Sequence, residues 1–453
     1  MAGAGVAAVS DGTAAYLNPA GLSDVRQPQV SLGLLGATAS FEAPPPLWWD
    51  TNRDGVVDSA DPPLEWDASM PPAMGLELAF ARHLGSKFGL GAVVYVPTNT
   101  LIRFRTFEPG LPTYALWQNR LQRFVVTAGV GGEVAPGVQV GMALDLLARV
   151  IVDAQATLDA SLAPPTTDGA GQDTLVVDVH SVDLDVKPAL APVIGIQLDL
   201  GAWTSALEGL RIGAGYHAPV GVPLVVRTDV QANLTVDDVG ELDPYTTAIV
   251  ATAELALFDH YVPPRLQLGA AWSWTDRLTL LVDTRFTDWR RFELSVAKAT
   301  DAVVTSPLVQ VDRWSDGNPY QVELRSVWSL RTGAELWSPR WEVGGGWRYL
   351  RLAARCGVGI EPTPLVSQGP ASAILDASRT LITGGVGLET WDPLDLVDGA
   401  LRFDAFFQAH LLATTALPRS SATPLAGYPV AADSLPVGGR VFAAGAQLGF
   451  DYR

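Results

Sequence analysis

Residues 265–292 read RLQLGAAWSWTDRLTLLVDTRFTDWRRF, and this stretch decides the fold class. Two runs of alternating residues are separated by a short polar turn at 275–277. In the second run Leu278, Leu280 and Val282 share one face, while Asp283 and Arg285 lie on the other. Alternation with period two on both sides of a short turn is the pattern of a β-hairpin.

The same pattern recurs along the chain, with short turns and long polar loops in alternation. An even set of about fourteen such strands is typical of an outer-membrane barrel. Because lipid cannot satisfy the hydrogen bonds of a free strand edge, a spanning sheet has to close on itself. The sequence therefore predicts an all-β fold, a transmembrane antiparallel β-barrel, although a secreted β-sandwich would also alternate. The predicted strands lie near residues 29–41, 72–83, 87–97, 120–134, 137–152, 180–200, 208–220, 248–272, 278–296, 319–336, 341–359, 378–390, 399–413 and 440–452.

The composition narrows the class of protein further. The 453 residues are 48% apolar and only 17% charged, yet no apolar run approaches the ~20 residues of a membrane helix. The net charge of −18 argues against a nucleic-acid partner, which would need a basic face. The only cysteine, Cys356, rules out an intramolecular disulfide. The start MAGAGVAAVSDG has neither a charged beginning nor an apolar core, so we expect no signal peptide in this sequence.

The motifs of common enzyme classes are missing from the sequence. There is no Gly-x-Ser-x-Gly elbow and no His-Glu-x-x-His helix, and the five histidines are scattered. We therefore expect that the protein is not an enzyme.

Residues 48–63, WWDTNRDGVVDSADPP, have the spacing of a Ca²⁺-binding loop, with oxygen ligands at alternate residues and a glycine for the turn. Pro62 and Pro63 deny the helix that would follow in a sensor protein. We expect a structural Ca²⁺ staple in an external loop, residues 43–70; a metal-free acidic turn is the alternative. The candidate ligands are side-chain oxygens of Asp50, Asn52, Asp54 and Asp61, the carbonyl of Val56, and Asp58 directly or through water.

Several stretches resemble the FadL family of outer-membrane transporters for long-chain fatty acids and aromatic hydrocarbons. They are VAAVSDGTAAYLNPAGLSDVRQPQVSLG (6–33), PPRLQLGAAWSWTDRLTLLVDTRFTDWRRF (263–292), LRTGAELW (330–337) and LRLAARCGVGIEPTP (350–364), in the family's order. Two departures stand out. The chain ends on Arg453 where the family has an aromatic residue, and residues 338–349 are longer than the family's turn.

The resemblance implies a division into a plug (hatch) at residues 1–27, inside the lumen, and a barrel at 28–453. Asn18, Pro19 and Ala20 match the plug motif and would take part in gating. Proline fixes its own φ and favours an extended residue before it, so the same three residues would also suit an ordinary turn.

The family's lateral opening lies at a kinked third strand, which makes Pro97 and Asn99 the candidates here. Proline lacks the N–H that a strand ladder needs, but Pro97 would equally well mark the end of its strand. Inside the lumen, Asp283 and Arg285 would either hold the plug through charge-assisted hydrogen bonds or act as solvated wall residues.

The expected function is passive uptake of hydrophobic compounds, either long-chain fatty acids or aromatic hydrocarbons. The ligand would occupy an internal apolar pocket and leave sideways through a lateral exit gated by the plug. The expected partners are a hydrophobic small molecule and outer-membrane lipid, with the protein as a monomer. Two alternatives stay open: a FadL-like barrel that carries or anchors secreted proteins at the surface, and a non-specific porin with a water-filled lumen.

Overall fold

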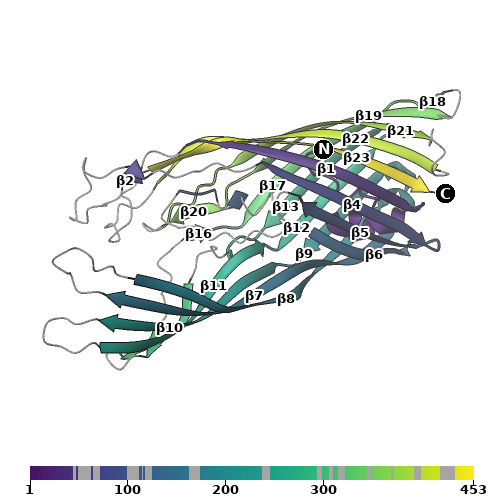
Figure 1. Cartoon of the computed structure of the whole chain (residues 1–453). Coiled ribbons are helices and arrows are strands. Elements are labelled where there is room, and N and C mark those ends of the chain that lie inside the picture. The colour runs from purple at the N-terminus through teal and green to yellow at the C-terminus, as the bar shows by residue number, and fades with distance from the viewer. Residues whose placement is uncertain are drawn as a thin grey trace.

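The barrel of the computed structural model is a closed antiparallel ring of fourteen strands (Figure 1). In ring order the strands are β1 (Gln29–Phe41), β4 (Ala73–Leu84), β5 (Phe88–Pro97), β6 (Val125–Ala135), β7 (Val138–Leu162), β8 (Thr174–Asp199), β9 (Leu210–His217), β12 (Arg265–Ser273), β13 (Leu278–Thr287), β17 (Val327–Trp337), β19 (Tyr349–Glu361), β21 (Arg379–Trp391), β22 (Gly399–Pro418) and β23 (Ser434–Tyr452). The first strand closes the ring, since Leu34 of β1 pairs with Leu76 of β4 on one side and with Ala446 of β23 on the other. The predicted fourteen-strand barrel is confirmed.

The structure describes residues 1–43, 47–48, 63–64, 72–98, 112–114, 116–117, 125–162, 174–236, 245–292, 298–305, 310–314, 322–343, 348–368, 372–391, 399–418 and 434–452. Among these residues, no helix has the length and apolar character needed to cross a membrane.

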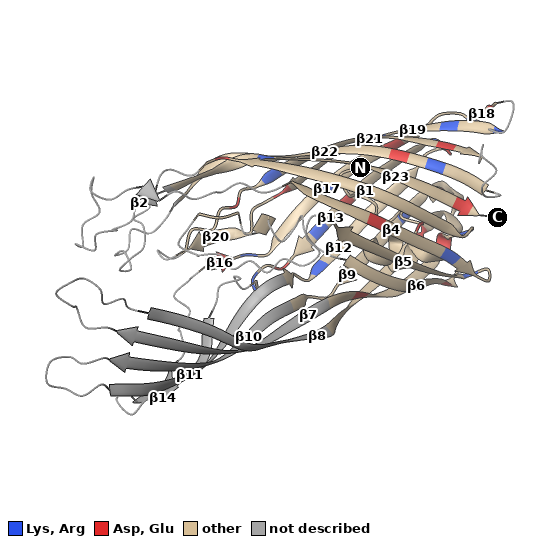
Figure 2. Ribbon diagram, in the orientation of Figure 1, with Lys and Arg blue, Asp and Glu red and all other residues tan. Residues whose placement is uncertain are grey.

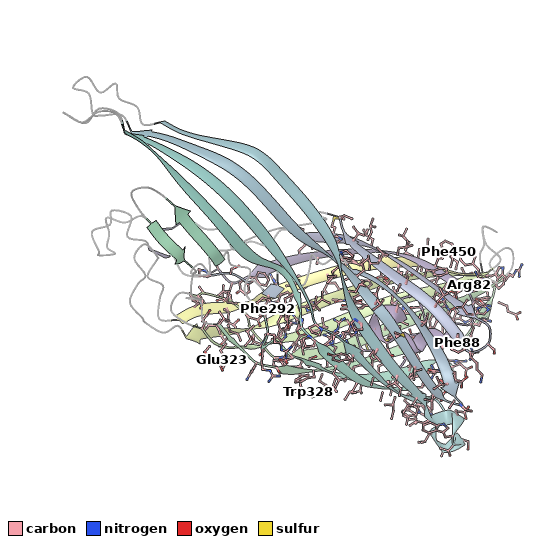
Figure 3. The ribbon with its side chains drawn as sticks, turned by 90° about the horizontal axis from the view of Figure 1, so that it is seen from below. Arg82, Phe88, Phe292, Glu323, Trp328 and Phe450 are labelled. Carbon is pink, nitrogen blue, oxygen red and sulfur yellow. The ribbon has the colours of Figure 1, made fainter. Side chains whose placement is uncertain are left out.

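The alternating pattern places apolar side chains on the outer surface of the wall. In β4, Leu76 and Leu78 are 43% and 50% exposed, whereas Ala79 and Ala81 on the opposite face of the strand are buried. Figure 3 shows outward side chains of this kind, such as Phe88 and Trp328. An outer apolar surface with a more polar interior is the arrangement that lipid requires of a spanning barrel.

Short connections gather at one end of the barrel, which we call the short-turn end. Gly85 and Gly137 lie in its tightest turns with φ of +67° and +73°, the left-handed region that favours glycine. Two short 3₁₀ helices, η2 (Leu200–Ala202) and η3 (Ser205–Leu207), connect β8 to β9. The long turn noted at 338–349 carries β18 (Trp341–Glu342), which pairs with the start of β19. The opposite end is the long-loop end.

An extension sheet rises from the long-loop end beyond the ring (Figures 1 and 3). Strands β7 and β8 run for 25 and 26 residues, against the roughly 9–11 that a bilayer needs. The outer part of β7 pairs in parallel with β10 (Val220–Val236), and β11 (Tyr245–Val262), β14 (Lys298–Thr305) and β15 (Gln310–Trp314) follow in order. Outside lipid, water can form hydrogen bonds with the unpaired backbone groups of an edge strand. The extension sheet therefore does not have to close into a ring.

The prediction of one strand at 248–272 was wrong. Pro263 and Pro264 divide it into β11, which belongs to the extension sheet, and β12, which belongs to the ring. Proline cannot donate to a strand ladder, so the chain changes partner at this point. As a result β12 pairs with β9 and the chain between them makes the outward excursion.

Two further segments lie inside the ring. Residues 1–27, the N-terminal segment, contain α1 (Ala14–Leu17) and η1 (Pro19–Asp24) and pack against the inner faces of β4 to β9 and β12. An outer cap, defined as residues 112–114, 116–117 and 372–378, lies toward the long-loop end, where Thr113 bridges to Ile374. Two small sheets complete the fold: β16 (Val322–Leu324) with β20 (Leu365–Gln368), and β2 (Leu47–Trp48) with β3 (Pro63–Leu64).

Candidate functional site

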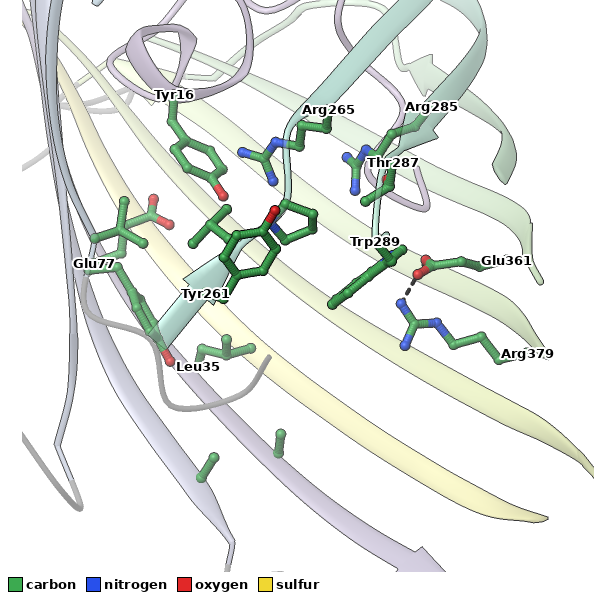
Figure 4. A pocket seen from close by; sticks show the side chains of 16 residues that line it. Tyr16, Leu35, Glu77, Tyr261, Arg265, Arg285, Thr287, Trp289, Glu361 and Arg379 are labelled. Atoms are coloured by element: carbon green, nitrogen blue, oxygen red, sulfur yellow. Dashed lines mark ion pairs between the residues drawn. The ribbon is translucent and has the colours of Figure 1, made fainter. Parts of the chain in front are cut away.

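A cavity of about 450 Å³ lies inside the barrel beside Tyr16 of the N-terminal segment (Figure 4). Strands β1, β4, β5, β6, β11, β12, β13, β19 and β21 contribute to its wall. Most of its lining is apolar or aromatic, interrupted by arginines and two glutamates. The lining residues are Tyr16, Leu35, Ala37, Ala73, Glu77, Tyr95, Val125, Tyr261, Val262, Pro263, Arg265, Arg285, Thr287, Trp289, Glu361 and Arg379.

Three arginines face this cavity, and they differ in their partners. Arg379 forms an ion pair of 2.6 Å with Glu361, which also receives Arg331 at 3.4 Å. Among the described residues, Arg265 and Arg285 have no carboxylate within ion-pair distance, and the Nε atom of each lacks a hydrogen-bond acceptor. A buried donor without an acceptor costs free energy, so these two side chains favour an acceptor supplied by a ligand or by water.

Tyr16 of α1 forms the cavity wall on the side of the N-terminal segment. The guanidinium of Arg265 lies 4.7 Å from the centroid of the Tyr16 ring, and the ring of His217 meets it edge-on at 5.3 Å. Arg265 Nη2 lies 3.0 Å from His217 Nδ1. A guanidinium is attracted to the face of an aromatic ring, so Arg265 ties Tyr16 to the barrel wall.

The outer cap contacts a cavity-lining residue through Trp117, which is 1% exposed. Arg379 lies 4.5 Å from the Trp117 ring centroid, and Phe41 of β1 stacks on Tyr114 at 4.0 Å. The Tyr114 hydroxyl donates to the Gly438 carbonyl oxygen over 3.1 Å. Burial raises the pKa of Tyr114, which keeps this hydroxyl protonated as a donor.

The N-terminal segment is held by polar contacts at several points, one of them from Ala2 N–H to Thr383 Oγ1 of β21 over 2.8 Å. The backbone N–H groups of Gly5 and Val6 donate to Asp283 Oδ2 over 2.7 and 3.0 Å. Asn18 is fully buried, and its Nδ2 donates to Val6 O at 2.6 Å and to Ile196 O of β8 at 3.2 Å. Asp24 accepts from Arg211 Nη1 at 2.7 Å.

Asn18 also caps η1, since its Oδ1 accepts from Ala20 N–H and Pro19 occupies the first helical position. The Asn-Pro-Ala motif therefore does two things: it starts a helix and it joins the segment to strand β8. Pro19 and Ala20 are both buried.

A belt of inward-facing glycines makes room for the segment. Gly89 pairs with Gly131, Gly131 with Gly141, Gly141 with Gly195, and Gly195 with Gly215, so the belt crosses five neighbouring strands in register. A β-carbon at Gly141 would overlap the backbone of Pro19, and one at Gly195 would overlap Asn18. Glycine is the residue that lets a second backbone approach a strand this closely.

The opposite part of the lumen wall carries charged side chains that meet each other, on β17 to β23 (Figure 2). Arg355 lies 2.5 Å from Glu335 and also bonds to Asp404. Arg402 lies 3.2 Å from Glu389 and 2.9 Å from Asp451. Each of these two arginines forms ion pairs with two carboxylates from other strands.

The predicted site residues have the following places. Asp283 faces inward, as the alternation predicts, and bonds to the N-terminal segment, while Arg285 lines the cavity instead. Pro97 is the last residue of β5 and pairs with Gly75. Asn99 lies outside the described residues, and so do all six predicted Ca²⁺ ligands (Asp50, Asn52, Asp54, Val56, Asp58 and Asp61). Strands β2 and β3 bring the two ends of that loop together, with Leu47 opposite Leu64.

Several functional residues were missed by reading the sequence. Tyr16, Asp24 and Trp117 come from segments without periodicity, which gives no information about their direction. The glycine belt left a detectable signal, because glycines recur at inward positions of consecutive strands. Its register, however, depends on strand pairing, which the sequence does not reveal directly.

A closed barrel with an apolar outer surface and a largely apolar cavity in its lumen is the architecture of a membrane channel for small molecules. The family described as "Outer membrane protein transport protein (OMPP1/FadL/TodX)" matches residues 1–338. The chain therefore belongs to this family of outer-membrane transporters of hydrophobic compounds. No curated protein sequence was found to match.

Solved structures with a similar fold include a FadL homologue from Pseudomonas aeruginosa, at 14% identity and a TM-score of 0.54, with 99% of this chain and 96% of that chain covered. The P. putida toluene transporter TodX is 14% identical with a TM-score of 0.46, over 98% of this chain and 95% of that chain. The Ralstonia pickettii toluene transporter TbuX is 13% identical with a TM-score of 0.45, over 99% and 98%.

Proposed function

We propose that this protein takes up hydrophobic compounds passively across the outer membrane, through the internal cavity and a lateral exit, with the N-terminal segment as a gating plug. The observation that carries the proposal is the cavity of about 450 Å³ inside the barrel, a volume within the roughly 300–1,000 Å³ of small-molecule pockets. Its aromatic and aliphatic lining suits an apolar solute. The long-loop end would face outward, as it does in barrels of this kind.

The arginines favour one substrate class over the other. An aromatic hydrocarbon offers no acceptor to Arg265 and Arg285, whereas a long-chain fatty acid places a carboxylate beside them and its tail against the apolar wall. Charge-assisted hydrogen bonds between arginine and carboxylate are about twice as strong as neutral ones. We therefore favour long-chain acids as the preferred ligands, with aromatic hydrocarbons as weaker ones.

The experiment is uptake by cells or lipid vesicles that contain the protein. Labelled long-chain fatty acid should enter faster than into empty controls, while vesicle swelling in small sugars should stay at the background rate. Rapid sugar entry would favour a porin and overturn the proposal.

The lateral exit would lie where β5 and β6 part toward the long-loop end. Their described pairing reaches Tyr95 opposite Val125, and both residues line the cavity. Pro97 follows without an N–H group, so it cannot extend this ladder. Val125→Trp should slow uptake several-fold; uptake at the rate of the unaltered protein would place the exit elsewhere.

The extension sheet favours a second candidate function, a surface carrier or anchor for secreted proteins. It stands beyond the ring and is not needed to cross a bilayer. Deleting residues 222–260 and joining the ends tests this idea. Normal fatty-acid uptake by the shortened protein, with loss of a surface-bound partner, would support the carrier function.

We also propose that the loop at 50–61 binds Ca²⁺ as a structural staple. Four carboxylates within one short loop repel each other, and a divalent ion removes that penalty. The pairing of β2 with β3 supports the proposal because it holds the ends of the loop close together.

A further inference from the structure

The wall of the cavity carries polar groups of opposite charge on opposite sides. Arg265 and Arg285 come from β12 and β13, whereas Glu77 comes from β4. In the ring of fourteen strands β4 is the second and β13 the ninth, so they lie seven positions apart in either direction. Figure 4 shows Glu77 on one side of the cavity and Arg285 on the other, with Tyr261 between them.

Glu77 forms a cross-strand pair with Tyr95. The two residues are directly opposite each other in the β4–β5 ladder, and both line the cavity. Among the described residues, no hydrogen bond or ion pair involves either side chain. The Tyr95 hydroxyl is packed over Gly75 instead, where a β-carbon would lie 2.2 Å from it. A carboxyl group accepts a hydrogen bond in either protonation state, so Glu77 favours a donor supplied by a ligand or by water.

Tyr261 places a second polar group along the same cavity. Its Oη atom is buried and has no hydrogen-bond partner among the described residues. A purely apolar chain across the cavity would cover Tyr261 Oη and the Glu77 carboxyl without bonding to either. A site with buried polar groups disfavours a ligand that lacks the matching group, because those groups are then left unpaired.

The width of the barrel determines how far apart the polar groups of a matching ligand must lie. Fourteen strands with a spacing of about 4.8 Å and a tilt near 40° form a ring roughly 28 Å across. The side chains of Arg285 and Glu77 shorten this span from opposite walls without closing it. A carboxylate at Arg285 and a donor at Glu77 must therefore lie near the two ends of a long chain. The reverse orientation would place the carboxylate beside Glu77, which repels it.

We propose that the cavity selects long-chain acids that carry a hydroxyl group far from the carboxylate. Arg265 and Arg285 bind the carboxylate, and Glu77 accepts a hydrogen bond from the hydroxyl. The inference rests on the proposed function, because it takes the cavity to be the fatty-acid site, and it makes Glu77 a specificity-determining residue. Glu77 is paired with Tyr95, where the described β5–β6 ladder ends, so the hydroxyl end of the chain lies nearest the proposed lateral exit.

The test is calorimetric titration of the full-length, detergent-solubilised protein with hexadecanoate, 16-hydroxyhexadecanoate and 3-hydroxyhexadecanoate. The 16-hydroxy acid should bind about fivefold tighter than hexadecanoate or more, because it adds a hydrogen bond to a charged group. The 3-hydroxy acid should bind no tighter than hexadecanoate, because its hydroxyl stays on the arginine side. Equal affinities for all three acids, or the same gain from both hydroxyl positions, would overturn the proposal.

Substitutions of Glu77 test the assignment of this residue. Glu77→Leu should remove the preference by strengthening the binding of hexadecanoate and weakening that of the 16-hydroxy acid. Glu77→Gln keeps an acceptor and should retain a preference of about twofold. Glu323→Leu is the matched control, since Glu323 is not part of the cavity lining and accepts from Ser367 over 2.8 Å. Folding of each variant is checked by its mobility in gels before and after heating. A full preference in Glu77→Leu would contradict the assignment.

Arg285→Met separates this inference from the proposed function. It should weaken the binding of all three acids by a similar factor and leave the preference for the 16-hydroxy acid in place. If no acid binds the parent protein, or if Arg285→Met binds all three as tightly as the parent does, the proposed ligand site is wrong. If hexadecanoate binds and the 16-hydroxy acid binds no tighter, only the selection by Glu77 is wrong.

Discussion

The two halves of the lumen wall differ in how their inward-facing side chains fill the interior of the barrel. On β17 to β23 the wall fills the interior with its own charged side chains, and Arg355 and Arg402 each meet two carboxylates. On β5 to β13 the wall carries glycines and leaves Arg265 and Arg285 without a carboxylate among the described residues. The N-terminal segment contacts both halves, through Thr383 in the first and Asp283 in the second. The first half pairs its charges without a ligand, whereas the second half leaves two arginines open to one.

The difference teaches how to separate structural charges from functional ones in a polar lumen. An arginine with two acids stabilises the fold, and its removal leaves the acids repelling each other. A buried arginine without a carboxylate partner lowers the stability of the ligand-free protein. It forms charge-assisted hydrogen bonds when an anion binds. The predictions below test this distinction, from the largest expected effect to the smallest.

Arg355→Met should destabilise the barrel by about 3 kcal/mol, because it leaves the carboxylates of Glu335 and Asp404 without their cation. Arg285→Met should change the free energy of unfolding by less than about 1 kcal/mol or increase it, because no partner is left behind. Urea unfolding of both variants in lipid vesicles measures the difference. If the free energy of unfolding fell by a similar amount in the two variants, the proposed distinction between the halves would be wrong.

Affinity for a fatty acid should depend on the arginines that matter least for stability. Arg285→Met and Arg265→Met should each weaken the affinity for a long-chain fatty acid by about tenfold or more, the usual loss for a hydrogen bond to a charged group. Affinity for toluene should stay unchanged, because it has no acceptor. Calorimetric titration of the detergent-solubilised protein checks this, with Arg355→Met as the control that should bind both ligands normally, provided that it folds.

The glycine belt should be intolerant of even one methyl group. Gly141→Ala places a β-carbon into the backbone of Pro19, and Gly195→Ala places one onto the Asn18 side chain. Both changes should raise protease cleavage within residues 1–27 several-fold. Gly33→Ala is the matched control, since its β-carbon would meet Glu77 at an ordinary 3.4 Å. If the control is cleaved as fast as the others, the belt has no special relation to the segment.

The acidic loop at 50–61 tests whether unpaired carboxylates also mark a binding site, here for a cation. Changes in this loop should have the smallest effect on barrel stability. Asp54→Ala should abolish Ca²⁺ binding measured by calorimetry at millimolar concentration, because it removes one of the proposed carboxylate ligands. Barrel unfolding should not shift with this change or with a chelator. An unchanged binding isotherm would leave the loop as an acidic turn.

The sequence predicted the ring well because strand alternation is dictated by lipid on one side and a polar lumen on the other. Leu280 outside and Asp283 inside follow from that alternation alone. The extension sheet was not predicted, since outside the membrane the two faces of a strand no longer have fixed environments. Nothing in the local sequence at Arg265 or Arg379 distinguishes an unpaired arginine from a paired one, because partners arrive from strands distant in sequence.

The closure of the ring has a consequence for the order in which this molecule is assembled. Strand β1 pairs with β23, so the ring closes only after the last residues of the chain have arrived. The N-terminal segment, which is made first, ends up enclosed by that ring. Its glycine belt lies on β5 to β9 and is complete by residue 217. The part of the segment around Pro19 can therefore dock on the belt while the sheet is still open. Its first residues bind Asp283 of β13 and Thr383 of β21, which come later in the chain.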